Sequence, residues 1–334
     1  MDILEVRKAV QTAYELKINF IEKIKNVYKI YTSDNQFCLK IIRYDFGHFL
    51  FIISAIKHLQ NNGFKNIPEI IKTQKGMEYI EVAGSYAYLT KWITSRECNY
   101  DNSVDILIAS SKLAELHKKS RGFEANETMN PRVGWFKWIE VFKTRRDEIL
   151  DFKRRIYKNK NRSEFDNKYL SMMKQELARA EMSIENLIKS PYLDFMNKEI
   201  INKSFCHHDY ANHNVLVDSH GEINIIDFDY CILDTHIHDL ASLIIRRMKN
   251  GKWNISNALF IIQAYSVINE VKKEEIPIMA GFMEFPQDYW QVGIQYYWEK
   301  QPWDEEFFMK KLKKIDKDRN EKQEFINDFR TIKI

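Results

Sequence analysis

Glycine and proline are scarce in this chain, since its 334 residues include only 10 Gly and 6 Pro. Because these residues dominate flexible and extended linkers, their scarcity leaves few places for long linkers. Apolar residues make up 45% of the chain and aromatic residues 13%, which indicates a globular protein rather than a disordered one. The length allows one large core or two lobes that share a cleft.

Cysteines are also few, and no apolar run is long. The four cysteines are scattered at Cys38, Cys98, Cys206 and Cys231. Free thiols at these positions fit a protein that is made and kept inside a cell. The longest apolar runs, near 49–56 and 258–268, are shorter than the roughly 20 residues that span a bilayer. Residues 1–5 show no basic region followed by an apolar run, so we expect no signal peptide.

The charge balance is mild, with a formal net charge of +4. It is locally basic, because the segment 137–162 has ten Lys or Arg against four acids. A charge-rich helix is most often a solvated face. Nucleic-acid binding would need a stronger basic excess and a known module, so we expect no nucleic-acid partner. The alternatives for this segment are a protein partner or an anionic surface.

Segment 205–229 carries the most informative motif. It reads FCHHDYANHNVLVD to residue 218 and continues to IIDFD at its end. This is a His-x-Asp-x-x-x-x-Asn pattern, then a strand, a turn at 219–221, a second strand and Asp-Phe, which matches the catalytic hairpin of kinase-type phosphotransferases. Asp209 would accept or orient the proton of a substrate hydroxyl. Asn214 and Asp227 would hold Mg²⁺ on nucleotide phosphates, because antiparallel pairing of the two strands places both residues at the same end of the hairpin.

A zinc site is the other interpretation of this segment, because three histidines, a cysteine and Asp209 lie close together in it. Zinc sites usually combine short cysteine and histidine pairs, and no cysteine pair here has that spacing. We therefore interpret His207 as the loop histidine of the catalytic site, which packs and forms hydrogen bonds rather than reacts. His208 and His213 are interpreted as ordinary loop residues.

Periodicity predicts a small sheet followed by a larger helical part. We expect helices at Ile3–Phe20 and Phe46–Asn61, and strands at Val27–Thr32, Phe37–Ile42, Glu78–Val82 and Tyr86–Trp92, with mainly helix from Asp105 onward apart from the hairpin. This order is that of a two-lobed kinase, in which a nucleotide lies in the cleft between the lobes.

Three further parts of the chain fit that plan. Lys40 stands in the strand 37–42, where a lysine pairs with nucleotide phosphates as a mobile point charge. Backbone groups of the connection between the lobes would meet the adenine edge, and its residues are Thr90, Lys91, Trp92 and Ile93. Asp239, a dozen residues after Asp227, would accept backbone N–H groups of the catalytic loop and brace it. Its alternative role is that of a helix N-terminal acid stabilised by the helix dipole.

With these residues in place, the chain resembles the aminoglycoside phosphotransferase-like kinases, and within them the spore coat CotS-like proteins. The supporting features are Asp-Leu-Ala at 239–241, Leu-Ala-Glu-Leu-His at 113–117, Gly134-Trp135, Ser-Pro-Tyr at 190–192, Trp253, the 285–290 segment FPQDYW and the 296–298 segment YYW. The resemblance implies an α+β, two-lobed protein-kinase-like fold, with ATP and Mg²⁺ as cofactors and a place in the spore coat. It implies an N-terminal nucleotide-binding lobe over 1–93 and a C-terminal helical lobe over 94–334.

Two departures from an active kinase pattern are visible. The helix expected at 46–61 contains no Glu, so Lys40 lacks the usual helix partner, for which Glu78 or Glu81 is a substitute. The strand-turn-strand start at 22–27 holds no glycine, so a close backbone cradle over phosphates is unsupported. Two hypotheses therefore stay open: a phosphotransferase acting on a hydroxyl of a small molecule or coat protein, and an inactive scaffolding coat protein with a kinase fold. The aromatic C-terminal residues 282–303 are expected to form core rather than line a substrate pocket.

Overall fold

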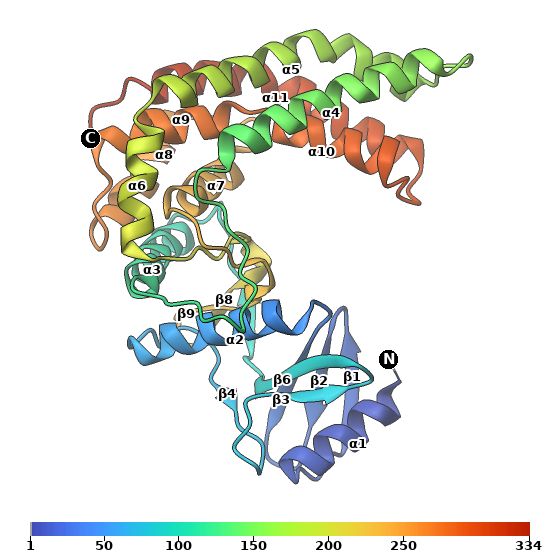
Figure 1. Ribbon diagram of the computed structural model, residues 1–334, viewed down its shortest axis with the longest axis vertical. Helices are drawn as coiled ribbons and strands as arrows, with labels where there is room; N and C mark the ends of the chain where they lie inside the picture. Colours follow the sequence, from blue (N-terminus) through green and yellow to red (C-terminus); the bar gives the residue numbers. More distant parts are fainter. Residues whose placement is uncertain (1) are drawn as a thin grey trace. The chain divides into compact units, whose positions relative to one another are not determined.

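The structure, a computed structural model, describes residues 2–334. The chain forms two compact units, one made of the residues up to Arg132 with Lys203–Leu233, the other of Val133–Asn202 with Asp234–Ile334 (Figure 1). The hairpin motif thus belongs to the same compact unit as the N-terminal sheet. This division differs from the expected boundary after residue 93, and the lobes 1–93 and 94–334 stay a prediction. Among the described residues, no helix is long and apolar enough to cross a membrane.

The first unit contains two antiparallel sheets and three helices. The larger sheet consists of β1 (Phe20–Ile24), β2 (Val27–Tyr31), β3 (Gln36–Ile42), β4 (Ile70–Ile71), β5 (Ile80–Val82) and β6 (Ser85–Lys91), and the smaller one of β7 (Ser95–Glu97), β8 (Val215–Asp218) and β9 (Ile223–Ile225). The helices are α1 (Ile3–Tyr14), α2 (Phe46–Asn61) and α3 (Ser103–Ser120). The predicted strands and the helix at 46–61 are confirmed to within a few residues, whereas β4 and β7 were not predicted.

The larger sheet has the strand order β1-β2-β3-β6-β4, with β5 also paired to β6. Successive side chains of a strand point to opposite faces. Phe37, Leu39 and Ile41 of β3 therefore lie on the face that packs with α1 in one apolar cluster. Cys38 and Lys40 lie on the opposite face, which leaves that face free to form a site.

The first helix is shorter than its apolar spacing predicts. It begins in a capping box formed by Asp2 and Glu5 and ends at Tyr14. Glu15 ends it by adopting the left-handed conformation, with φ of 53°, while its N–H still donates to the carbonyl of Gln11. The expectation of helix up to Phe20 is wrong, because Phe20 is the first residue of β1.

The predicted hairpin in 205–229 is confirmed. Strand β8 pairs with β9 in antiparallel register, and β7 joins the outer side of β8. Asn66, which precedes β4, holds this hairpin to the rest of the unit. Its carbonyl accepts the N–H of Ile225 at 2.7 Å, and its side-chain amide donates to the carbonyl of Ile223 at 2.6 Å.

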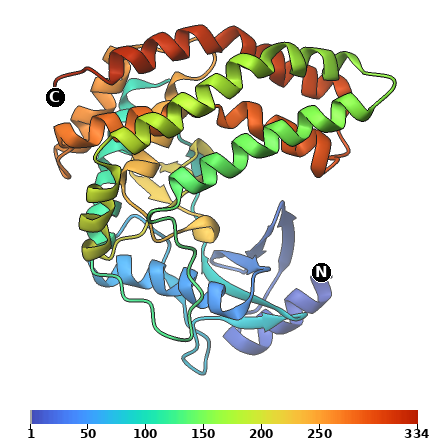
Figure 2. The same ribbon diagram turned by 45° about the horizontal axis from the view of Figure 1, so that its top comes forward.

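The second unit is helical. Its helices are α4 (Trp138–Lys158), α5 (Glu164–Lys189), α6 (Tyr192–Asn202), α7 (Ile237–Met248), α8 (Ile255–Ser266), α9 (Ile276–Glu284), α10 (Gln287–Gly293) and α11 (Glu305–Phe329), with a π-helical turn at Ile294–Trp298. Helices α4 and α5 run side by side, as both views show (Figures 1 and 2). The basic segment 137–162 is therefore mostly α4 and the connection to α5.

Aromatic side chains form much of the core of the second unit, as expected for residues 282–303. Tyr169 and Tyr289 stack with ring centroids 4.2 Å apart, and the Tyr289 hydroxyl donates to the Tyr169 carbonyl at 2.8 Å. Gly293 allows this packing, since a Cβ there would come within 2.4 Å of the Tyr169 hydroxyl and 2.6 Å of the Phe152 ring. Trp298 and Trp303, in contrast, are exposed.

A buried histidine lies between two carboxylates in the second unit. The Nδ1 and Nε2 atoms of His236 each lie 3.2 Å from a carboxylate oxygen, of Glu199 and of Glu275 respectively. Both ring nitrogens must donate to form these bonds, so the ring is an imidazolium. Burial opposes this charge, but the two carboxylates raise the pKa of His236 to about 10. In the same cluster, burial opposes the charge on Glu199, but the His236 imidazolium lowers the pKa of Glu199 to about 2.

We predict that this cluster makes stability depend on pH. A folded-state pKa above the unfolded value means that the folded state binds more protons, so stability falls as pH rises from about 6.5 to about 10. Removing one partner of a buried ion pair typically costs about 3–5 kcal/mol. His236→Gln should therefore unfold at lower denaturant concentration near neutral pH, with the difference from wild type narrowing toward pH 10. The exposed His220→Gln is the control, and an unchanged difference across this range would contradict the assignment.

Candidate functional site

A cavity of about 610 Å³ opens on the face of the larger sheet that α1 does not cover. Its wall includes alternate residues of β2, β3 and β6, which cross-strand pairing places side by side. Lys40 pairs in register with Val27 on one side and Tyr88 on the other, and all three border the cavity. The volume lies within the roughly 300–1,000 Å³ that is usual for small-molecule sites.

The residues predicted to meet the adenine edge border this cavity, namely Thr90, Lys91, Trp92 and Ile93. The hairpin contributes Asn214 and Asp227 to the same wall. The cavity therefore brings together the predicted lysine, the predicted connection and both predicted metal ligands.

Lys40 is held between two aspartates of the hairpin. Its Nζ lies 3.0 Å from Oδ2 of Asp227 and 3.0 Å from Oδ2 of Asp229. Burial alone would lower the pKa of Lys40, but the two carboxylates reverse this and raise it. The side chain is only 6% exposed, so these ion pairs are poorly screened by solvent. Strand β3 and the hairpin are thus joined by a buried charge cluster.

The two aspartates differ in their proton affinity. For Asp227, burial is opposed by Lys40, and the pKa of Asp227 falls below its ordinary value. For Asp229, burial and the neighbouring charge of Asp227 raise the pKa above its ordinary value. Oδ1 of each aspartate is buried and has no hydrogen-bond partner among the described residues. Two buried carboxylate oxygens without donors are a donor set that suits a hard divalent cation such as Mg²⁺.

The loop before the hairpin places Asp209 next to Asn214. The side-chain amide of Asn214 donates to Oδ2 and to the backbone carbonyl of Asp209, both at 3.0 Å. His207 is fully buried, and its Nε2–H donates to the carbonyl of Ile226 at 2.9 Å. Its Nδ1 accepts the N–H of Asp209 at 3.3 Å. This histidine thus links the segments that carry Asp209 and Asp227.

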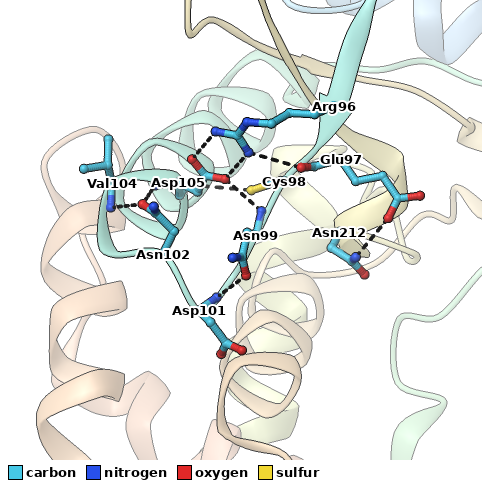
Figure 3. Close-up of polar contacts among 9 residues, drawn as sticks. All are labelled: Arg96, Glu97, Cys98, Asn99, Asp101, Asn102, Val104, Asp105 and Asn212. Atoms are coloured by element: carbon cyan, nitrogen blue, oxygen red, sulfur yellow. Dashed lines mark hydrogen bonds and ion pairs between the residues drawn. The ribbon is translucent and has the colours of Figure 1, made fainter.

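A polar network around β7 fixes the segment that carries Asn214 (Figure 3). Arg96 binds the carboxylate of Asp105 through both terminal nitrogens, at 2.6 and 2.8 Å. Asp105 lies in the first turn of α3, so this bidentate pair ties β7 to that helix. Glu97, next along β7, accepts a hydrogen bond from the Asn212 side chain at 3.2 Å. The turn before Asn214 is therefore tied to β7, and β7 in turn is tied to α3.

The expected helix partner of Lys40 is replaced. Glu78 pairs with Lys57 at 2.5 Å, and Glu81 is exposed on β5, so neither is the partner that the sequence suggested. Helix α2 instead contributes the buried His48, whose Nε2 lies 3.4 Å from the carbonyl of Asp229. Its Nδ1 lies 3.2 Å from the carbonyl of Asn130. Sequence reasoning missed both Asp229 and His48, although Asp229 stands in the Asp-Phe-Asp motif only two residues after Asp227.

The start of the sheet carries lysines in place of glycines. Strands β1 and β2 are joined by the two-residue turn Lys25-Asn26, and Lys25 has φ of 53°. Both turn residues border the cavity, as does Lys29 of β2. Lys29 places its Nζ 4.5 Å from the centre of the Trp92 ring, a cation–π contact. The sequence revealed the missing glycine, but not that lysines border the cavity in its place.

Asp239 is the one predicted site residue outside this unit. It lies in the first turn of α7 in the second compact unit and is fully buried. Its position in the helix agrees with the helix-dipole alternative. Its role in bracing the loop around Asp209 stays a prediction.

The profile of one protein family, described as "Spore coat putative kinase YutH", matches residues 7–329. The chain belongs to this family. The match covers nearly the whole chain and confirms the resemblance to spore coat CotS-like proteins. No functionally curated protein matches the chain.

Solved structures with the same fold are kinases of the aminoglycoside phosphotransferase type. The aminoglycoside phosphotransferase from Alicyclobacillus acidocaldarius matches with a TM-score of 0.84 and 18% identity, over 97% of this chain and 95% of that one. Spectinomycin phosphotransferase, in complex with ADP and spectinomycin, has a TM-score of 0.71 and 17% identity over 99% of both chains. Amicoumacin kinase, in complex with AMP-PNP and Ca²⁺, has a TM-score of 0.65 and 13% identity over 98% and 94%. At such identities the likeness establishes the fold, and the predicted kinase-like α+β class is confirmed.

We predict that Lys40→Met destabilises the first unit and makes its stability depend on divalent cations. The substitution leaves Asp227 and Asp229 facing each other without a cation, and losing one partner of a buried charge cluster costs about 3–5 kcal/mol. Millimolar Mg²⁺ should restore part of this loss, and more than it adds to wild type. Denaturant unfolding with and without Mg²⁺ measures both effects. Lys29→Met, which removes a lysine from the same cavity wall, is the control, and an equal response of the two variants would contradict the prediction.

Proposed function

We propose that this member of the spore coat kinase family binds ATP with Mg²⁺ in the cavity on the sheet and transfers phosphate to a hydroxyl. The acceptor is a small molecule or another coat protein. The observation that carries the proposal is the charge cluster on the cavity wall, in which Lys40 lies between Asp227 and Asp229 while two carboxylate oxygens keep no donor. One lysine offsets only one of two carboxylates, so the cluster favours additional positive charge.

Each residue of the site has a part in this proposal. Asn214 and Asp227 would hold Mg²⁺, whose charge would shield the phosphates during transfer. Lys40 would turn part of its hydrogen bonding from the aspartates to phosphate oxygens. Asp209, already oriented by Asn214, would hold the acceptor hydroxyl and take its proton. Backbone groups of Thr90–Ile93 would form hydrogen bonds with the purine base. Titrations with ATP and with GTP would show which of the two nucleotides binds more tightly.

A scaffolding coat protein without turnover is the second candidate. The observation that favours it is the engagement of Lys40 by both site carboxylates, together with a helix α2 that offers His48 where an active kinase has Glu. Such a protein would keep the fold and bind nucleotide without transfer. Its contacts with other coat proteins would use the basic segment 137–162, on which Lys153 and Arg154 of α4 are exposed. Family membership supports a place in the spore coat in both cases.

The first test of nucleotide binding is Asp227→Ala. Removing a metal-ligating carboxylate should abolish Mg²⁺-dependent nucleotide affinity while the fold persists, because Lys40 keeps Asp229 as a partner. A ligand at 100 times its Kd adds about 2.7 kcal/mol to stability, so a thermal-shift titration with MgATP resolves the difference. Asp34→Ala, in an exposed turn, is the control. The absence of both a thermal shift and titration heat for wild type at millimolar MgATP would overturn the proposed binding.

The test that separates enzyme from scaffold is Asp209→Asn. Positioned general-base assistance is worth about 10²–10⁴ in rate. An active kinase should therefore keep MgATP binding in this variant and lose transfer by a factor of that order. Release of ADP from ATP is the first readout, because the acceptor is not identified. If the variant and the wild-type protein release ADP at equal rates, the activity comes from another source. If the wild-type protein binds MgATP but transfers phosphate to no candidate acceptor, the scaffolding function is favoured.

A further inference from the structure

A second cavity, of about 220 Å³, lies within the helical unit and has no residue in common with the first. It is bordered by α5, the segment after α7, α10 and α11. Basic side chains dominate its wall, namely Arg179, Lys249, Lys311, Lys314, Arg319 and Lys322. These six cations face four carboxylates on the same wall. The cavity therefore carries a positive surplus before hydrogen bonding is considered.

The carboxylates on this wall are already occupied. Glu284 accepts hydrogen bonds from Asn186, Gln323 and Arg330, at 2.6 to 2.9 Å. Asp288 pairs with Lys249 at 2.8 Å, and Asp318 accepts the backbone N–H groups that follow Lys249. A cationic ligand would have to displace these partners, so the wall offers few acceptors to a ligand.

Glu176, the fourth carboxylate, is buried in the wall and lies 3.4 Å from Arg179. Burial raises the pKa of Glu176, although Arg179 and the other nearby cations oppose this shift. Arg179 also donates to the backbone carbonyl of Arg319 at 2.5 Å. Two arginines from α5 and α11 are thereby fixed at one end of the cavity, Arg179 beside the buried Glu176 and Arg319 paired with Asp316 at 3.1 Å.

Donor groups, unlike acceptors, are left over at this cavity. Among the described residues, the indole N–H of Trp253 and the Nε–H of Arg319 are buried without an acceptor. The ammonium of Lys322 is 3.4 Å from its acceptor, the carbonyl of Phe285. Desolvation of this ammonium lowers the pKa of Lys322 to about 8, although Asp288 and Glu176 oppose the shift more strongly than Lys249 and Arg179 add to it. An anion in the cavity would supply the acceptors that these buried donors lack and would offset the desolvation of Lys322.

We propose that this cavity binds a small phosphate-bearing anion. The volume is below the roughly 300 Å³ at which pockets for drug-sized ligands begin, so it suits inorganic phosphate, pyrophosphate or a short phosphate ester rather than a nucleotide. Phosphate is favoured over a carboxylate because the donors come from α5, α11 and the segment after α7, and phosphate oxygens accept from several directions at once. Such a ligand would join these three segments of the second unit.

The experiment is a titration of the full chain with inorganic phosphate at constant ionic strength, with sodium chloride as the balancing salt. Binding is followed by calorimetry and by the indole N–H resonance of Trp253, assigned with Trp253→Phe. Lys322→Gln should weaken phosphate binding by about tenfold or more, the loss expected for one charge-assisted hydrogen bond. Lys310→Gln is the matched control, because Lys310 is exposed on the same helix and does not border the cavity. Lys314→Gln, at an exposed border residue, gives a second weakened variant that leaves the buried wall intact.

Four outcomes decide the proposal. Saturable binding that shifts the Trp253 resonance, survives Lys29→Met and falls in Lys322→Gln and Lys314→Gln supports it, because Lys29 borders only the other cavity. Equal weakening in Lys310→Gln would overturn it, since the effect would then be one of net charge. Equally tight binding of acetate, or no saturable phosphate binding, would also overturn it.

Discussion

A lysine held between two aspartates joins the sheet of the first unit to its hairpin, and the site depends on this contact. Lys40 reaches across 187 residues of sequence to Asp227. One positive charge cannot offset two carboxylates in a buried place, so one of them, Asp229, has a raised pKa and both keep an unsatisfied oxygen. The preference of the site for added positive charge follows from this imbalance.

The helix beside the sheet is coupled to the site by hydrogen bonds rather than by an ion pair. His48 of α2 lies between the backbone carbonyls of Asn130 and Asp229. A helix glutamate would act on the lysine itself and compete with the aspartates for it. A histidine that contacts the backbone carbonyl of Asp229 instead helps to position the carboxylate of Asp229. This contact therefore couples α2 to the segment that carries Asp229 and not directly to Lys40.

Sequence spacing predicted the part of the site that is local in the chain. Asp209, Asn214 and Asp227 lie within one strand-turn-strand segment, so their convergence follows from pairing of β8 with β9. The partner of Lys40 could not be predicted this way, because the contact depends on how distant segments pack. Strand β7 was missed for a related reason: its three exposed residues have no apolar alternation, and only pairing with β8 makes them a strand.

The short turn between β1 and β2 has a kinetic consequence for any molecule that occupies the sheet cavity. A two-residue turn is already closed by strand pairing between Ile24 and Val27, so its backbone has little freedom to fold over a ligand or to swing away. Entry and exit on that side then require only rotation of the Lys25 and Lys29 side chains, which is far faster than the microsecond-to-millisecond opening of a loop. On that side, the β1–β2 turn therefore adds no slow opening step to the exchange of a ligand.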